Sequence, residues 1–382
     1  MNRRRFLAAS ATAAVAAPSW LAHGERKTNR RWLLVGTQTH KDSKGIYSYD
    51  WNPATGELQG GDLAAASDNP TFLALDPAAG YLYAANELEQ FEGQKSGAVS
   101  AFALDHPARK LRPINQVPAL GTATCNVSVD AVGRAAFCAN YGSGSASSFY
   151  LNPDGQISDA VSHFQYTGHG ADPERQAGPH AHRVTVSPDN RWLLVNDLGL
   201  DCIHIYHLDP TSARLTPNQP PAWHGAPGSG PRALRFHPNG HIAYCVCEMG
   251  SVVNVLHWDT QKGTLRELQT ISLVPDDYHG PTAGCDIVVT RDGRFAYAIN
   301  RFYDFAESFS IAKDGRLTLL ARIPCGGKTP RHLALDPTES FLLVANQDSD
   351  NISVLAREAK TGKLTETGRS YPRVKPQCLV FA

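Results

Sequence analysis

The stretch TPRHLALDPTESFLLVANQ, residues 329–347, decides the fold. It reads as a Pro-Arg pair, an alternating apolar segment, a turn that begins Asp-Pro, a second apolar segment and a closing Asn. Two short apolar segments joined by a compact turn of this chemistry predict a β-hairpin.

The same pattern recurs along the chain with different letters. Further copies are NPTFLALDPAAGYLYAANE (69–87), ATCNVSVDAVGRAAFCANY (123–141), HAHRVTVSPDNRWLLVND (180–197), GPRALRFHPNGHIAYCVCE (230–248) and GCDIVVTRDGRFAYAINR (284–301). The seventh copy is split, because KPQCLVFA (375–382) matches the first half and RRWLLVGTQ (30–38) matches the second. The closing positions lie 46 to 56 residues apart, which leaves room for two further strands in each repeat. The sequence therefore predicts an all-β, seven-bladed β-propeller whose last blade is closed by N- and C-terminal strands.

One domain accounts for residues 30–382, because no Pro/Gly/Ser-rich linker or shift in composition separates the repeats. The formal net charge of the 382-residue chain is zero, which argues against nucleic acid as a partner. The eight cysteines include no CxxC pair, and six of them lie within predicted strands. We expect packed thiols at these positions.

Residues 1–24, MNRRRFLAASATAAVAAPSWLAHG, differ from the repeats. Consecutive arginines, then x-Phe-Leu, then a run of small apolar residues resemble a twin-arginine export signal. The apolar run is too short and too rich in alanine to span a bilayer of ~30 Å. We therefore expect a periplasmic or secreted protein that is not held in the membrane once the signal is removed.

The topology of a propeller identifies one end of its central channel as the candidate site. The residues just before the first strand of each blade and those just after the second strand meet at the same mouth. Ionisable and amide side chains are dense there, whereas the opposite rim consists mostly of Asp-Pro-type turns. The repeated closing Asn has a structural explanation, because its side chain can bond turn backbone.

Three features of this mouth do not repeat. Glu248 occupies a position that is Tyr, Asp, Arg or Gln in most blades, Arg301 is equally unusual, and Pro-His-Ala-His places His180 and His182 at one blade entrance. A carboxylate, guanidinium groups and a histidine at one opening suit a substrate with a carboxylate, a phosphate or a polarised ester carbonyl. The other residues expected to bind substrate here are Asp286, Arg331, His332 and Gln347.

The stretches GPHAHRVTVSPDNRWLLVNDLG, GPRALRFHPNGHIAYCVCE, GRFAYAINR and GKTPRHLALDPTESFLLVANQDSDNISVL resemble the lactonase family of seven-bladed propellers. That family includes propeller-type 6-phosphogluconolactonase and carboxy-cis,cis-muconate lactonizing enzyme. The resemblance implies hydrolysis of a sugar lactone or a related lactone. It also implies His182, Arg232, Glu248 and Arg301 as catalytic residues and requires no cofactor or metal.

The chain departs from the family pattern at three places. Cys247 precedes Glu248 where the family commonly has Asn, Asp286 replaces a glutamate, and FYDFAESF follows Arg301 in place of a short Gly-containing turn. These changes predict a mouth of altered shape. Insertions at 162–180 and 272–283 are expected to lie over the same face.

The mechanistic hypothesis is attack of water on a lactone carbonyl, with Glu248 or His182 as general base and Arg232 and Arg301 stabilising the oxyanion. Two alternatives remain open, a muconate-type cycloisomerase and a non-catalytic ligand-binding propeller. A calcium-dependent lactonase is disfavoured because such enzymes resemble six-bladed rings. Export disfavours a phosphorylated sugar as the substrate.

Overall fold

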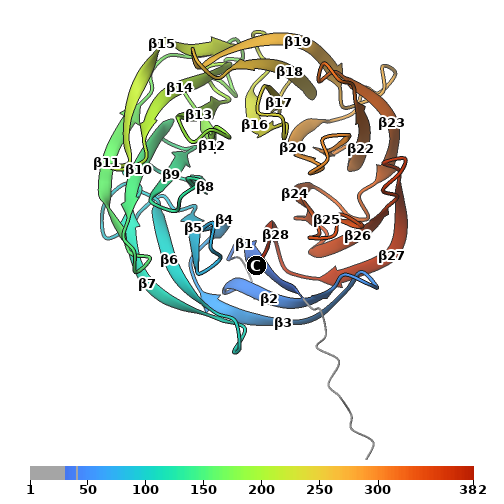
Figure 1. Cartoon of the computed structure of the whole chain (residues 1–382), viewed down its shortest axis with the longest axis horizontal. Helices are drawn as coiled ribbons and strands as arrows, with labels where there is room; N and C mark the ends of the chain where they lie inside the picture. The colour runs from blue at the N-terminus through green and yellow to red at the C-terminus, as the bar shows by residue number, and fades with distance from the viewer. Residues whose placement is uncertain (1–30, 40–41) are drawn as a thin grey trace, which may run out of the picture.

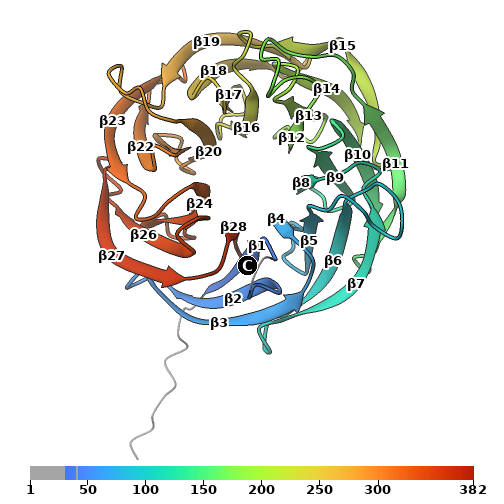
Figure 2. The ribbon, with the colours of Figure 1, turned by 180° about the vertical axis from the view of Figure 1, so that it is seen from behind.

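The computed structural model of the protein describes residues 31–39 and 42–382. This part of the chain forms seven four-stranded antiparallel sheets and contains no helix. The sheets stand radially around a central channel (Figures 1 and 2), so the predicted seven-bladed β-propeller is confirmed. The export signal predicted at 1–24 lies outside the described residues.

The first three blades follow one another along the chain, each with its first strand beside the channel. Blade 1 contains β4 (Pro70–Leu75), β5 (Tyr81–Asn86), β6 (Ala98–Asp105) and β7 (Lys110–Pro118). Blade 2 contains β8 (Thr124–Val129), β9 (Ala135–Asn140), β10 (Ser145–Leu151) and β11 (Ile157–Gln165). Blade 3 contains β12 (Ala181–Val186), β13 (Trp192–Asp197), β14 (Cys202–Asp209) and β15 (Arg214–His224).

The next three blades repeat this order. Blade 4 contains β16 (Pro231–Phe236), β17 (Ile242–Cys247), β18 (Val252–Asp259) and β19 (Thr264–Ser272). Blade 5 contains β20 (Ala283–Val289), β21 (Phe295–Arg301), β22 (Phe305–Ile311) and β23 (Leu317–Pro324). Blade 6 contains β24 (Pro330–Leu335), β25 (Phe341–Asn346), β26 (Asn351–Arg357) and β27 (Leu364–Pro372).

Blade 7 is assembled from both ends of the chain, as the split repeat predicts. It contains β28 (Pro376–Phe381), β1 (Arg31–Thr37), β2 (Gly45–Asn52) and β3 (Glu57–Ala66). Strand β28 pairs antiparallel with β1, and Figure 1 shows it as the innermost strand of that blade. This pairing closes the ring and covers the edge that β1 would otherwise expose.

The hairpin of residues 329–347 shows why the repeats fold locally. The Asp336 carboxylate accepts hydrogen bonds from the backbone N–H groups of Thr338 and Phe341 at 3.1 and 2.9 Å, which fixes the turn between β24 and β25. At the other end of β25, the buried Asn346 amide donates to Ser353 Oγ at 3.0 Å. The closing asparagine is therefore part of the scaffold in this blade.

Apolar side chains of neighbouring blades interdigitate between the sheets. One such layer contains Tyr244, Ala298 and Phe309, all fully buried. All eight cysteines are buried and present as free thiols, as the sequence predicted. The described part of the chain holds no helix long and apolar enough to cross a membrane.

Candidate active site

A polar pocket opens at the mouth that the topology predicts. Its volume is about 190 Å³. Its wall consists of Glu87, Cys125, Tyr141, Arg175, His182, Glu248, Arg301 and Arg331. Each of these residues except Arg175 lies at the start of a first strand or at the end of a second strand, so the repeat itself places them together.

Glu248 is the centre of this pocket. The strand β17 ends at Cys247, and Glu248 N–H is held by Gly230 O at 2.8 Å, so the carboxylate projects from the rim of blade 4. Its Oε2 lies 2.9 Å from Arg232 Nε and 2.6 Å from Arg301 Nη2. Its Oε1 lies 2.7 Å from Arg175 Nη2. One carboxylate therefore meets three guanidinium groups, which leaves a surplus of positive charge for an anionic ligand.

These contacts fix the protonation of the carboxylate. Burial alone raises the pKa of Glu248, but the charges of Arg301 and Arg232 outweigh burial and hold the pKa well below its usual range. Glu248 is consequently an anion at every physiological pH. A carboxylate stabilised so strongly in its charged form is a weak proton acceptor.

His182 has the opposite character. It is 9% exposed and lines the same pocket. Burial, followed by the positive charge of Arg232, lowers the pKa of His182 well below its usual value, so the imidazole is neutral at pH 7. The ring of Tyr141 meets it edge-on at 5.6 Å. His182 is thus an uncharged base in a pocket where the neighbouring carboxylate is not available as one.

His180 is placed behind this pocket rather than in its wall. Its ring stacks on Tyr141 with centroids 4.5 Å apart, and its Nδ1 lies 2.9 Å from Tyr141 O. The backbone N–H of His180 donates to Asp197 Oδ1 at 2.8 Å. In this arrangement His180 supports Tyr141. Its predicted contact with substrate stays a prediction.

Asp286 and His332 lie deeper in the channel, where they form a floor beneath the mouth pocket. His332 Nε2 lies 3.6 Å from Asp286 Oδ2, and Arg183 Nη2 lies 3.3 Å from Asp286 Oδ1. The Arg183 guanidinium also covers the ring of Phe72 at 4.9 Å. These four residues come from blades 1, 3, 5 and 6, so their side chains meet across the channel. Only about 20 Å³ of space remains among them and the pocket wall.

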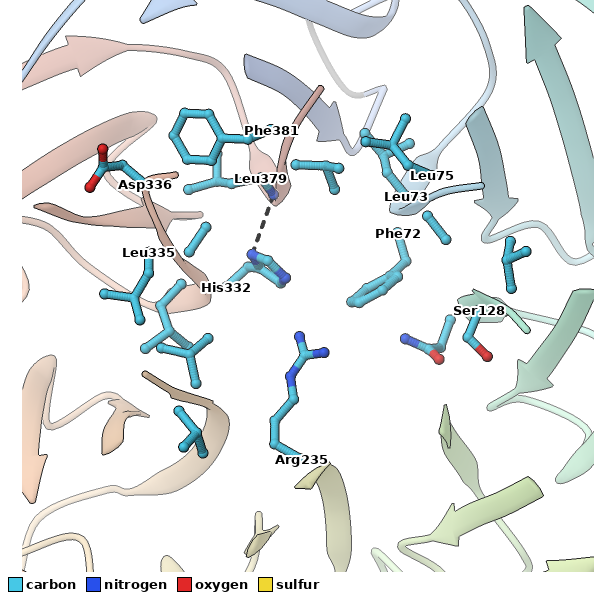
Figure 3. A pocket seen from close by; sticks show the side chains of 18 of the residues that line it. Phe72, Leu73, Leu75, Ser128, Arg235, His332, Leu335, Asp336, Leu379 and Phe381 are labelled. Carbon is cyan, nitrogen blue, oxygen red and sulfur yellow. Dashed lines mark hydrogen bonds between the residues drawn. The ribbon is translucent and has the colours of Figure 1, made fainter. Parts of the chain in front are cut away.

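Beyond this floor the channel widens to a second cavity of about 660 Å³, largely apolar (Figure 3). Figure 3 shows His332 and Phe72 pointing into it with Arg235, and Leu379 N–H donating to His332 Nδ1 at 3.3 Å. Because Nδ1 accepts this bond, the neutral ring carries its proton on Nε2, facing Asp286. Burial lowers the pKa of His332 to about 4. We therefore assign Asp286 and His332 to the floor of the site.

Arg331 lines the mouth pocket, whereas Gln347 does not. The Gln347 Oε1 accepts a hydrogen bond from Gln377 Nε2 at 3.0 Å, and Gln377 borders the small space at the floor. Gln347 therefore touches the site only through Gln377, and its role in substrate binding stays a prediction.

Arg175 contacts Glu248 but was not predicted as a site residue from the sequence. It lies in the segment 166–180 between β11 and β12, which is shorter than the predicted insertion because β11 continues to Gln165. The fully buried Gln176 anchors this segment by donating to Leu198 O and Asp201 Oδ1, both at 2.8 Å. The insertion was expected over this face, but no local pattern identifies which of its side chains reaches Glu248.

Metal ligation receives no geometric support in the part of the chain that the structure describes. No group of three or more His, Cys, Asp or Glu side chains is arranged there to hold a metal ion. The acidic residue of the pocket centre instead faces guanidinium groups, whose charge repels a cation.

Comparison with known proteins identifies relatives over nearly the whole chain. Residues 32–381 match the family described as lactonase, 7-bladed beta-propeller. A 6-phosphogluconolactonase of Bacillus subtilis is 34% identical over 348 residues, covering 91% of this chain and 97% of the relative. A periplasmic gluconolactonase of Pseudomonas aeruginosa is 32% identical with a TM-score of 0.87, covering 92% of this chain and 99% of that structure. A putative 6-phosphogluconolactonase of Bacteroides fragilis is 33% identical with a TM-score of 0.85, covering 93% and 99%.

Proposed function

Because this chain belongs to the lactonase family of seven-bladed β-propellers and is a lactone-hydrolysing enzyme, we propose that the mouth pocket around Glu248 is its active site. The substrate is a sugar lactone or a related lactone, and His182 is the general base. The observation that carries this assignment is the presence, in one pocket, of a neutral imidazole and a carboxylate that three guanidinium groups keep ionised.

The proposed reaction proceeds through a tetrahedral intermediate. His182 takes a proton from water as the water oxygen bonds to the lactone carbonyl carbon. The carbonyl oxygen becomes an oxyanion beside Arg301, whose fixed charge stabilises it. Arg232 does not line the mouth pocket but the small space at its floor, and its positive charge adds to the stabilisation from there. The ring C–O bond then breaks, and the leaving alkoxide takes the proton back from His182, which restores the neutral base.

Glu248 acts in this scheme by orienting the arginines. Its two oxygens hold Arg232, Arg301 and Arg175 at 2.6 to 2.9 Å, so the guanidinium groups are in place before substrate arrives. The buried Arg301 Nε has no acceptor among the described residues. A substrate oxygen can satisfy this donor, which supports Arg301 as part of the oxyanion site.

The test is an assay of the purified protein on glucono-δ-lactone and 6-phosphogluconolactone, corrected for spontaneous hydrolysis. Replacing the base in His182→Gln is expected to lower kcat/KM by ~10²- to 10⁴-fold. His241→Gln changes an exposed histidine on the opposite rim and serves as the matched control. Turnover that is equal in wild type, His182→Gln and Glu248→Gln would remove the proposal.

We also propose that the protein acts outside the cytoplasm. The proposal is supported by Arg3 and Arg4 ahead of Phe6 and Leu7 in the N-terminal segment, and by the similarity to a periplasmic gluconolactonase. Changing Arg3 and Arg4 together to Lys should leave the protein in the cytoplasmic fraction of cells that export the natural chain. Unchanged export of the double variant would contradict a twin-arginine signal.

A further inference from the structure

One feature of the mouth has no role in the chemistry proposed above. The turn between β21 and β22, residues 302–304, carries Phe302, whose side chain is 53% exposed. It is the sole aromatic residue among the large hydrophobic residues that the described chain exposes. An exposed phenylalanine ring leaves apolar area in water, and a ligand that covers this area gains binding energy.

The backbone of this turn is strained in a way that other blades avoid. Phe302 has a φ of +71°, in the left-handed region that a bulky residue rarely adopts. Phe302 lies two residues after Asn300, the closing position of its repeat. The equivalent residues of blades 2, 4 and 6 have no positive φ; they are Gly142, Met249 and Asp348. The strain is therefore specific to blade 5 and is not imposed by the propeller repeat.

Several contacts hold the turn in this conformation. Asp304 Oδ1 accepts hydrogen bonds from the backbone N–H of Phe302 at 3.2 Å and of Thr329 at 2.8 Å. Tyr303 stacks on Phe305 at 4.4 Å and meets the ring of Tyr278, from the segment between β19 and β20, at 4.6 Å. The aromatic neighbours thus pack together while Phe302 remains outside. Strain that the surroundings maintain in this way is typical of functional sites.

The exposed ring is continuous with the active site. Its centroid lies 5.9 Å from Cζ of Arg301, and Arg301 Nη2 lies 2.6 Å from Glu248. The mouth pocket, at about 190 Å³, is smaller than the roughly 300 Å³ at which ordinary ligand pockets begin. It has room for one lactone ring, and a larger substrate must extend over the rim.

We propose that Phe302 forms a second subsite that binds a further pyranose ring of the substrate. The C–H face of a sugar ring is weakly positive and apolar, and it complements the negative face of an aromatic ring. The proposal rests on the proposed function and narrows the substrate class to lactones of glycosylated sugar acids, with the lactone in the mouth pocket and the second ring on Phe302.

The experiment compares a one-ring lactone, glucono-δ-lactone, with a two-ring lactone, cellobiono-δ-lactone. Phe302→Ala is expected to lower kcat/KM for the two-ring substrate by about 5- to 10-fold and to change the one-ring value less than twofold. Phe302→Trp, which keeps an aromatic face, should retain the preference. Val132→Ala removes an exposed apolar side chain from the opposite rim and should change neither substrate.

Two outcomes would overturn the subsite. One is an equal loss on both lactones in Phe302→Ala, and the other is no loss on either. Phe302→Gly, which suits a positive φ, provides a second variant in which folding is not at risk and should behave like Phe302→Ala.

Failure of the proposed function is distinguishable from failure of the subsite. If the wild type hydrolyses neither lactone, calorimetry with the acids cellobionate and gluconate tests the subsite alone. Tighter binding of cellobionate by the wild type, lost in Phe302→Ala, supports it. Equal affinities for the two acids overturn it.

Discussion

At the scale of single residues, the environment assigns chemical roles that side-chain identity leaves open. Glu248 and His182 are both candidate bases by type, and they occupy the same pocket. Three guanidinium groups stabilise the ionised carboxylate, whereas burial among positive charges stabilises the neutral imidazole. The carboxylate therefore loses basicity, and the imidazole keeps a free lone pair at neutral pH.

The shifted pKa of His182 predicts an unusual pH dependence. An ordinary histidine base is protonated below its pKa near 6.5, and activity falls there. Because the pKa of His182 lies well below that value, kcat/KM is expected to stay flat from about pH 8 to pH 6 and to decline only in more acidic buffer. Initial rates measured across this pH range, and in more acidic buffers, test the predicted profile of kcat/KM.

Arg232→Gln provides the comparison for this pH profile. Among the neighbouring charges, that of Arg232 lowers the pKa of His182 most. Its removal should therefore raise this pKa and move the acidic decline in kcat/KM toward higher pH. A wild-type profile that falls with an apparent pKa near 6.5 would contradict the assignment of His182.

At the scale of elements, the segment 166–180 completes a site that the blades alone leave open. Asp172 Oδ1 accepts the backbone N–H groups of Glu174 and Arg175 at 2.9 and 2.8 Å, and Gln176 is fully buried. The segment is therefore built to present Arg175, which is 47% exposed, to a carboxylate 73 residues further along the chain. We therefore expect the partly exposed Arg175 guanidinium to bind an anionic group of the substrate as well.

Removing this guanidinium tests the role of the segment. Arg175→Ala is expected to raise KM about 10-fold or more for a lactone with an anionic substituent, since a charge-assisted hydrogen bond contributes ~1.5–3 kcal/mol. The effect on a neutral lactone should be smaller. Glu174→Ala, an exposed neighbour on the same turn, is the control. Identical KM values for Arg175→Ala and Glu174→Ala would show that the contact with Glu248 plays no part in binding.

At the scale of the whole molecule, the ring depends on a pairing between its two ends. Strand β28 contributes the buried Cys378 and Leu379 to the layers on either side of blade 7. It also supplies Gln377 beside the floor of the site. The stability of the ring and the geometry of the floor therefore both depend on β28.

Deletion of residues 376–382 is expected to lower the melting temperature strongly. The deletion removes the ladder between β28 and β1 and the four buried residues 376–379, of which the leucine alone contributes about 1.5–3 kcal/mol. Calorimetry of the deleted chain measures this, with removal of Ala382 alone as the control. Melting that is unchanged after the larger deletion would show that the ring does not require closure by β28.

The sequence by itself determined the ring, the number of blades and the end of the channel at which the polar pocket lies. These features follow from patterns that can be read along the chain. Strand alternation and turn residues such as Asp336 are properties of neighbouring residues, and the number of blades follows from how often that local pattern recurs. Even the split blade was predictable, because each half keeps its own pattern.

Only the tertiary structure decided which polar side chains meet. Glu248, Arg232 and Arg301 were expected together, but Arg175 was found only by its contact, and Asp286 and His332 lie in the floor. The physical reason is that a hairpin pattern fixes where each strand ends. Contacts across the channel depend instead on how far the side chains of non-neighbouring blades reach. Arg183 of blade 3 meets Asp286 of blade 5 over a separation of 103 residues, and no local pattern records that distance.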